Sequence, residues 1–396
     1  MIFKALRKLN KCDYYTALWF IYYLQGTVYA KGSIISRSIL LIALIMSVCH
    51  LYKVIHISNK PPYFKGLFLI IAMFTFYGLF AIVFQGNFYR VTGSYVNHVS
   101  QLQAIYTSLL PIFTYYYYAS IGALKKKQIM IWFFLFIISA TVSYHQMQKE
   151  LMEAMLYRVN QRDAVTNNIG YTFLAIFPGF IFFKEKPLIQ FVLLGYVLVY
   201  LIMGMKRGAI LIGALCSLYY IRYLLLNADA KIKKWFYLLT VLLIIAGYRF
   251  IIHMMNTSEY MLMRINDTLE GDSSHRDVLY SFFWEYYKNQ DSIFHLLFGN
   301  GQASTAHIFF NFAHNDWLEI LINNGMMGAV IYIYYWMCLV ATTKRAINYD
   351  AKIIMIMFGL IYIFKTFFSM SYNDIDYSAA CFLGYSLVYM NKPQFE

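Results

Sequence analysis

The sequence predicts an all-α, polytopic helical membrane protein with about 12 transmembrane helices. Sixty per cent of its 396 residues are hydrophobic and only 13% are charged, about half the charged fraction of a soluble globular protein. Apolar stretches close to the roughly 20 residues that cross a bilayer as a helix recur along the chain. They are continuously apolar, whereas the strands of a membrane β-barrel alternate between apolar and polar residues.

The expected helices fall into three consecutive sections of the chain. Residues 1–252 hold helices 1–9 with short loops, residues 253–325 form a long outer loop with interfacial helices, and residues 326–396 hold helices 10–12. The expected spans are residues 15–29, 34–52, 66–84, 104–124, 129–144, 171–183, 188–205, 209–226, 236–252, 326–343, 353–370 and 377–390.

Clusters of lysine and arginine set the expected orientation of these helices. With the N-terminus inside, every second loop is cytoplasmic, and these loops carry the basic clusters. Both termini are then cytoplasmic, and the first helix is expected to be retained. The net charge of +14 reflects this topology, so no nucleic-acid partner is expected. The basic loops hold Lys53, Lys60, Lys65, Lys125, Lys126, Lys127, Lys184, Lys186, Lys231, Lys233, Lys234, Lys344, Arg345 and Lys352.

Cysteine and histidine residues show no metal-binding pattern. The five cysteines lie in or beside expected spans and form neither a disulfide framework nor a CxxC pair. His253, His295 and His307 lack the spacing of metal ligands. The sequence therefore predicts no metal site and no cofactor.

The short turn 204–208 (GMKRG) places Lys206 and Arg207 at the expected outer end of a span. An arginine near hydrocarbon is unfavourable, by about 2.5–3.5 kcal/mol at mid-membrane on insertion scales. Two interpretations are open: Arg207 extends to lipid headgroups, or its guanidinium binds a phosphate or diphosphate bidentately. The flanking glycines would let an anion approach the backbone, with Lys206 as a second ligand.

Residues 271–290 predict an amphipathic helix at the outer interface. Ser274 and Asp277 match a capping box. An apolar stripe follows at helical spacing, made up of Val278, Leu279, Phe282, Phe283, Tyr286 and Tyr287. Arg276 lies in the first turn, where a cation is unfavourable beside the positive end of the helix dipole. A bound anion would reverse that penalty, and a solvated arginine is the alternative. Arg264 is a third candidate anion ligand.

The densest polar cluster lies in AHNDWLEILINNG, directly before an apolar helix. His314 can accept a proton from a hydroxyl near neutral pH, so it is a candidate general base, although a lone histidine is more often structural. Asp316 or Glu319 would orient His314 or serve in its place. Because unsatisfied polar groups are costly at a membrane edge, their clustering favours a functional site.

Glycines and an asparagine accompany this cluster. Asn315 follows the histidine directly, and Gly325 comes after nine further residues. Gly325 and Gly328 would let the following helix pack closely. The preceding FGNG, with Gly299 and Gly301, predicts a tight turn directed back toward the cluster.

Four stretches, HNDWLEILINNG, LFGNG, HRDVLYSFFWEYY and MGMKRGA, resemble the O-antigen ligase and polymerase superfamily of bacterial envelope polysaccharide assembly. The specific part of the resemblance runs from about Gly204 to Tyr332. The His-Asn-x9-Gly pattern matches the ligase-type motif position for position. The paired Arg-x10-Gly loop motifs of some polymerases are not found, which puts a two-loop shuttle mechanism in doubt.

The resemblance implies a metal-independent glycosyl transfer on the periplasmic face of the bacterial inner membrane. The donor would be a glycan on undecaprenyl diphosphate. Arg207 and Arg276 would hold the diphosphate leaving group, and His314 would activate the acceptor hydroxyl. Because the donor is already activated, charge stabilisation and one base suffice. The expected partners are this glycan and membrane lipids, with a chain-length regulator and a flippase as further candidates.

Two other functions stay open beside the polymerisation of O-antigen, capsule or exopolysaccharide repeat units. A ligase would transfer the glycan to lipid A core, and the sequence hardly separates it from a polymerase. A transporter or a lipid-linked oligosaccharide flippase would show related halves and polar residues near mid-membrane. Here the polar residues gather at the outer edge and the halves look unrelated, which favours an enzyme.

Overall fold

The computed structural model describes residues 10–90, 95–156, 165–227, 230–269, 276–309 and 311–395. Contacts within the chain define two compact units. The first comprises Met1–Ala43 and Ile121–Asp272, and the second comprises Leu44–Ser120 and Ser273–Phe395. The chain passes from the first unit to the second within helix α3 (Ile34–Ile55).

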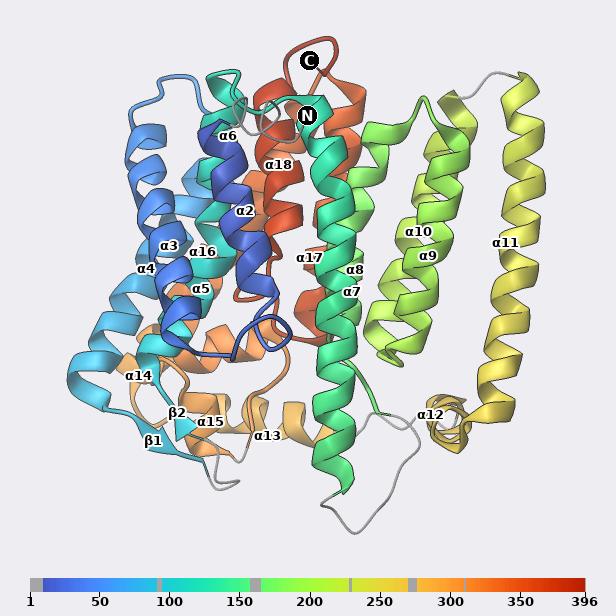
Figure 1. The fold of residues 1–396 in the computed structure, drawn as a ribbon. Helices are drawn as coiled ribbons and strands as arrows, with labels where there is room; N and C mark the ends of the chain where they lie inside the picture. The colour runs from blue at the N-terminus through green and yellow to red at the C-terminus, as the bar shows by residue number, and fades with distance from the viewer. Residues whose placement is uncertain are drawn as a thin grey trace. The chain divides into compact units, whose positions relative to one another are not determined.

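The regular elements in the described residues of the first unit are all helices, and an isolated β-bridge joins Gln25 to Tyr29. In Figure 1 the axes of α7, α9, α10 and α11 run roughly parallel to one another, and α12 lies across the lower end of α11. Its elements are α2 (Lys11–Tyr23), the start of α3, α7 (Lys126–Leu156), α8 (Gly170–Ile176), the 3-10 helix η2 (Phe177–Phe183), α9 (Pro187–Met203), α10 (Arg207–Asn227), α11 (Ala230–Thr257) and α12 (Glu259–Leu269).

The second unit packs long helices around α16 and carries its short elements at one end (Figure 1). Two short antiparallel strands, β1 (Phe88–Tyr89) and β2 (Tyr95–Val96), are paired there. The helices are the end of α3, α4 (Tyr63–Phe80), the π-helix η1 (Ala81–Gln85), α5 (His98–Leu109), α6 (Pro111–Ser120), α13 (Arg276–Lys288), α14 (Ile293–Phe298), α15 (Ser304–Ile308), α16 (Asp316–Arg345), α17 (Tyr349–Phe368) and α18 (Tyr377–Tyr389).

Seven helices in the described part of the chain are long and apolar enough to cross a membrane. The chain is therefore of the all-α, multi-pass membrane class that its composition predicts. Two further apolar stretches, Gly170–Phe183 and Leu188–Met203, are shorter. The seven are Ile34–Ile55, Tyr63–Gln85, Lys126–Ala154, Arg207–Leu226, Tyr237–Thr257, Asp316–Arg345 and Tyr349–Phe368.

Several expected spans differ from the observed helices, and two of these differences have a clear local cause. The expected span 104–124 is divided into α5 and α6 at Pro111. Proline lacks an N–H and favours the first position of a new helix, which accounts for the division. The expected span 129–144 is part of a longer helix, because the amphipathic sequence that follows continues α7 to Leu156.

Backbone contacts at one end of the second unit join segments that were all expected on the cytoplasmic side. The Tyr63 N–H, at the start of α4, donates to Thr342 Oγ1 near the end of α16, at 2.8 Å. The N–H groups of Ile347 and Asn348 donate to the carbonyl of Met390 beyond α18, at 2.8 and 2.9 Å.

The opposite end joins segments that were expected on the outer side. Tyr77, near the end of α4, donates through its hydroxyl to the Phe298 carbonyl at 2.6 Å. The Ser371 N–H, between α17 and α18, donates to Asp316 Oδ1 at 2.9 Å. Within this unit the helices thus alternate in direction as the positions of the lysine clusters predict.

Two glycines let long helices of the second unit approach each other closely. A Cβ atom at Gly66 of α4 would lie 2.7 Å from the Cα of Tyr335 of α16. A Cβ atom at Gly384 of α18 would lie 2.8 Å from the backbone nitrogen of Tyr116 of α6. Small residues at such crossings bring helix backbones together and increase van der Waals contact, as is common in membranes.

We expect Gly66→Ala to lower the thermal stability of the detergent-solubilised protein, because the new methyl group meets the backbone of α16. Overpacking of this kind typically destabilises by about 1–3 kcal/mol. The matched control is Gly195→Ala in α9, where nothing lies within 4 Å of the added carbon. Equal melting temperatures for the two variants would show that the α4–α16 contact is not as close as described.

Candidate functional site

The polar motif forms a tight turn that leads into α16. His314 is half-buried and has a φ angle of 51°, in the left-handed region. Asn315 is the N-cap of α16, and its side-chain oxygen accepts from the N–H groups of Trp317 and Leu318 at 3.0 and 3.2 Å. This capping explains why an asparagine follows the histidine, since it satisfies helix N–H groups that have no partner within the helix.

Glu319 connects three segments through one fully buried carboxylate. Its Oε1 accepts from the Ala313 N–H at 2.6 Å. Its Oε2 accepts from Thr305 Oγ1 of α15 at 2.6 Å and from Asn323 Nδ2 at 3.1 Å. A buried carboxylate is stable only when its oxygens are satisfied in this way. Glu319 therefore fixes the residue that directly precedes His314.

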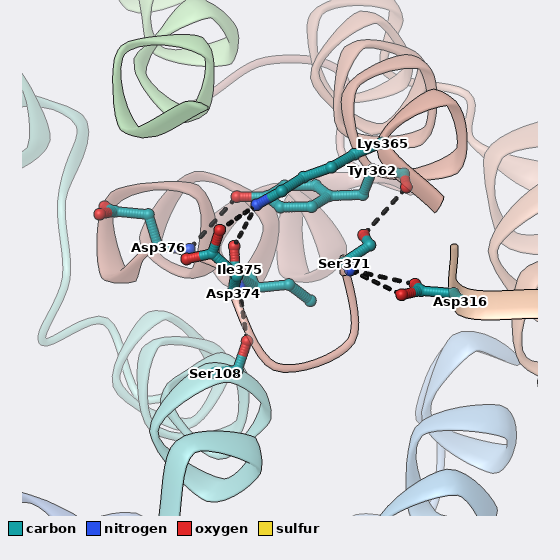
Figure 2. A network of polar contacts seen from close by, with 8 residues as sticks. All are labelled: Ser108, Asp316, Tyr362, Lys365, Ser371, Asp374, Ile375 and Asp376. Carbon is teal, nitrogen blue, oxygen red and sulfur yellow. Dashed lines mark hydrogen bonds and ion pairs between the residues drawn. The ribbon is translucent and has the colours of Figure 1, made fainter. Parts of the chain in front are cut away.

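Asp316, also fully buried, attaches the turn to the loop between α17 and α18. Its Oδ2 accepts from the Tyr332 hydroxyl at 2.5 Å, and the Ser371 N–H donates to both carboxylate oxygens at 2.9 and 3.1 Å. Figure 2 shows Asp316 reaching the backbone of Ser371. The two carboxylates of the motif thus hold the turn from both sides.

The loop between α17 and α18 is itself held by polar contacts (Figure 2). Lys365 of α17, buried within a candidate span, forms an ion pair with Asp374 and donates to its carbonyl at 3.2 Å. The Ser371 hydroxyl donates to the Tyr362 carbonyl at 2.9 Å. The Ile375 N–H donates to the hydroxyl of Ser108 in α5. Lys365 therefore serves to anchor this loop.

The FGNG stretch forms the predicted tight turn and packs against the end of the motif. The N–H groups of Asn300 and Gly301 each donate at 2.9 Å, to the carbonyls of Ile322 and Asn323 respectively. Gly325, with a φ of 67°, interrupts α16 directly after these carbonyls. The turn therefore caps the C-terminal end of helical segment 316–324, whose carbonyls would otherwise lack partners.

The two glycines Gly299 and Gly325 allow this contact because their backbones touch. A Cβ atom at Gly299, where φ is 76°, would lie 2.5 Å from the backbone of Asn323. A Cβ atom at Gly325 would lie 2.5 Å from the nitrogen of Gly299. Only glycine combines this φ with this proximity. The glycine of the His-Asn-x9-Gly pattern is thus a structural requirement of the turn.

Helix α13 brings Arg276 close to the His314 turn. Arg276 Nη1 donates to the Phe368 carbonyl at 2.9 Å, at the C-terminal end of α17. Tyr280, one helical turn further, donates to the carbonyls of His314 and Phe367 at 3.3 and 3.1 Å. Burial raises the pKa of the Tyr280 hydroxyl, and the neighbouring Arg276 charge acts to lower it. Arg276 and His314 thus flank one tyrosine.

The apolar face of α13 holds the helix against the motif. Leu279, Phe283 and Tyr287 are buried in a cluster with Ala313 and Ile322. The expected stripe is therefore only partly correct: Val278, which the pattern assigns to it, is 61% exposed. The predicted capping residue Ser274 lies outside the described residues.

The GMKRG turn lies in the first unit, where α10 begins at Arg207. The Gly204 carbonyl accepts from the N–H of the buried Asn167 at 2.8 Å. Met205 has a φ of 50° and packs in an apolar cluster with Tyr260 of α12. Lys206 and Arg207 are both half-buried. The turn is thus a packed element of the unit.

Arg264 lies on α12, the helix that packs on the GMKRG turn through Tyr260. The first unit therefore holds Lys206, Arg207 and Arg264, whereas the second unit holds Arg276 and His314 together. The meeting of these two groups in one pocket stays a prediction.

Backbone strain coincides with the candidate residues. Among the described residues, three non-glycine residues have φ in the left-handed region: Met205, Ala303 and His314. Met205 directly precedes Lys206 and Arg207. Such conformations cost about 1–3 kcal/mol each and often occur at functional sites.

The described residues contain no group of three or more His, Cys, Asp or Glu side chains that could hold a metal ion. No protein-family model matches the chain, and no curated protein has a similar sequence.

We expect Glu319→Ala to destabilise the protein by on the order of 3 kcal/mol or more, because three buried donors lose their acceptor at roughly 1–3 kcal/mol each. The measurement is the free energy of unfolding in a denaturing-detergent titration. The control is Glu285→Ala on α13, where an exposed ion pair with Lys288 contributes at most about 1 kcal/mol. A Glu319→Ala variant as stable as this control would contradict the structural role of Glu319.

Proposed function

We propose that this protein is a membrane glycosyltransferase that polymerises undecaprenyl-diphosphate-linked oligosaccharide repeat units on the periplasmic face of the bacterial inner membrane. The observation that carries the proposal is the His314 turn, which is held in a left-handed conformation by contacts on three sides, with Arg276 beside it. The resemblance of the surrounding motifs to the O-antigen ligase and polymerase superfamily supplies the substrate class.

The proposed reaction is a displacement at the anomeric carbon of the donor glycan. An acceptor hydroxyl forms the new glycosidic bond while the bond from the anomeric carbon to the diphosphate oxygen breaks. His314 takes the proton of the hydroxyl, and the undecaprenyl diphosphate leaves with the electron pair. Guanidinium groups stabilise the negative charge that grows on the diphosphate, and this electrostatic stabilisation assists its departure.

Asp316 and Glu319 act in this proposal as positioning residues. Both are fully buried, and their carboxylate oxygens accept hydrogen bonds from Tyr332, Ser371, Thr305, Asn323 and the Ala313 N–H. Their contacts hold the backbone on each side of the histidine. In this proposal His314 is the general base, and the two carboxylates keep it in place.

Arg276 can serve both structure and substrate. Its contact with the Phe368 carbonyl uses one of the five N–H donors of the guanidinium. The remaining donors on the fork match the geometry of a diphosphate. In this proposal Arg207, with Lys206 and Arg264, supplies the remaining ligands of the anion. The protein has twelve spans, and both of its termini are cytoplasmic.

We expect His314→Ala to abolish chain extension while the protein still inserts and melts normally. Loss of a general base typically lowers the rate by about 10²–10⁴-fold. The measurement is the ladder of glycan lengths made by cells that carry the variant as their only copy. His295→Ala, at an exposed position of α14, is the control and should give a normal ladder. A normal ladder from His314→Ala would refute the catalytic assignment.

We expect Arg207→Lys to lower chain extension by about tenfold, because lysine keeps the charge but cannot bind a diphosphate bidentately. The same ladder assay measures the effect. Arg222→Lys, at an exposed position of the same helix, is the control. Full activity of Arg207→Lys would mean that a bidentate contact at this position plays no part.

A further inference from the structure

A pocket of about 360 Å³ lies in the second unit beside α15 and the β1–β2 hairpin. Its volume is at the lower end of the range of roughly 300–1,000 Å³ found for small-molecule sites. Three apolar or aromatic side chains, Phe88, Tyr286 and Ile308, line part of it. The remaining lining residues carry amide, hydroxyl or imidazole groups: Gln85, His98, Asn300, Gln302, Ser304 and His307.

The composition of this lining selects a class of ligand. The described lining residues include no lysine, arginine, aspartate or glutamate. The proposed diphosphate site, in contrast, rests on guanidinium groups. Burial lowers the pKa of His98, which keeps that ring neutral near neutral pH. A pocket of amides, hydroxyls and aromatic rings suits a neutral, polar ligand with many hydroxyl groups.

The hydrogen-bonding state of two buried side chains indicates what this ligand must supply. His98 is 1% exposed, and its Nε2 lies 2.9 Å from the Gly86 carbonyl. Because a carbonyl only accepts, Nε2 is the donor, and Nδ1 of the neutral ring is an acceptor. Among the described residues, neither His98 Nδ1 nor Oε1 of the 8%-exposed Gln302 has a partner. Both atoms can accept a hydrogen bond.

Ring contacts at the same place suit the faces of a sugar ring. Phe88 and His307 meet edge to face, with their ring centroids 5.0 Å apart. The two unsatisfied acceptors belong to residues that line this one pocket, which is the pattern of a binding site rather than of a packing defect.

We propose that this pocket binds a neutral sugar residue of the glycan that is transferred at His314. The inference rests on the proposed function and adds a subsite to it. Hydroxyl groups of the sugar donate to the amide and imidazole acceptors, and the aromatic side chains pack against its ring. The pocket thereby selects the glycan by its sugar, while the guanidinium groups recognise its diphosphate.

A single short helix couples this pocket to the proposed base. Ser304 and His307 of α15 line the pocket. Thr305, between them on the same helix, donates to Glu319 at 2.6 Å. Glu319 accepts from the Ala313 N–H, directly before His314. The helix that lines the pocket is thus connected to the His314 turn through two hydrogen bonds. These contacts would fix the position of a bound sugar relative to the proposed base.

The test fills the pocket by His307→Trp, a position that is exposed and so tolerates a larger side chain. Purified full-length protein in nanodiscs is titrated with glucose, N-acetylglucosamine and glucuronate, and binding is followed by saturation-transfer NMR. We expect the wild type to bind a neutral sugar more tightly than glucuronate. We expect His307→Trp to weaken this binding about tenfold and to shorten the glycan ladder in cells.

Two controls separate this inference from the proposed function. His295→Trp should bind sugar and extend chains as the wild type does, and thermal melting checks that each variant is folded. His314→Ala should bind the sugar normally while making no chains. Sugar signals as strong in His307→Trp as in the wild type, or a normal ladder from it, would overturn the subsite. Sugar binding that depends on His307 beside a normal ladder from His314→Ala would leave the subsite standing and refute the base.

Discussion

The second unit depends on the buried carboxylate of Glu319. Three donors from three segments converge on it, so α15, the loop before α16 and α16 itself are held at fixed distances. A carboxyl group in so apolar a protein is tolerated only because both of its oxygens have hydrogen-bond partners. The cost of leaving those donors unpaired is what keeps His314 in a backbone conformation that it would otherwise leave.

The residues of the polar motif have different roles in the structure. Its polar residues look alike in the sequence, yet the structure divides them into two kinds. Asn315, Asp316, Glu319 and Asn323 are engaged in caps and buried contacts, and they hold the turn on which His314 is placed. Preorganisation of this kind is what a catalytic base requires, since a loosely held imidazole would lose much of its effect. Most of the polar motif is therefore support for one side chain.

Features that depend on local chemistry could be predicted from the sequence. The FGNG turn, the break at Gly325, the helix after Arg276 and the alternation of helix directions in the second unit follow from glycine, helical periodicity and lysine placement. The division at Pro111 could also have been predicted, because the proline is visible in the sequence. The continuous apolar run 104–124 instead led to the prediction of a single span. Contacts between distant residues gave no such signal. Asp316 and Ser371 are 55 positions apart, and nothing near Ser371 marks it as a partner. Tyr280 could have been noticed only as the residue one turn after Arg276 on the same helix face.

The most direct measurement is chemical cross-linking between the two candidate turns in membranes, with the native cysteines replaced. Cysteines at Lys206 and at the exposed Asp277 would place one thiol beside Arg207 and the other beside Arg276. If the two guanidiniums share one anion site with His314, a short bifunctional thiol reagent should join the two positions, and a membrane-impermeant reagent should reach both from the periplasm. Efficient labelling of each cysteine without any cross-link, or labelling from opposite sides of the membrane, would contradict a shared site.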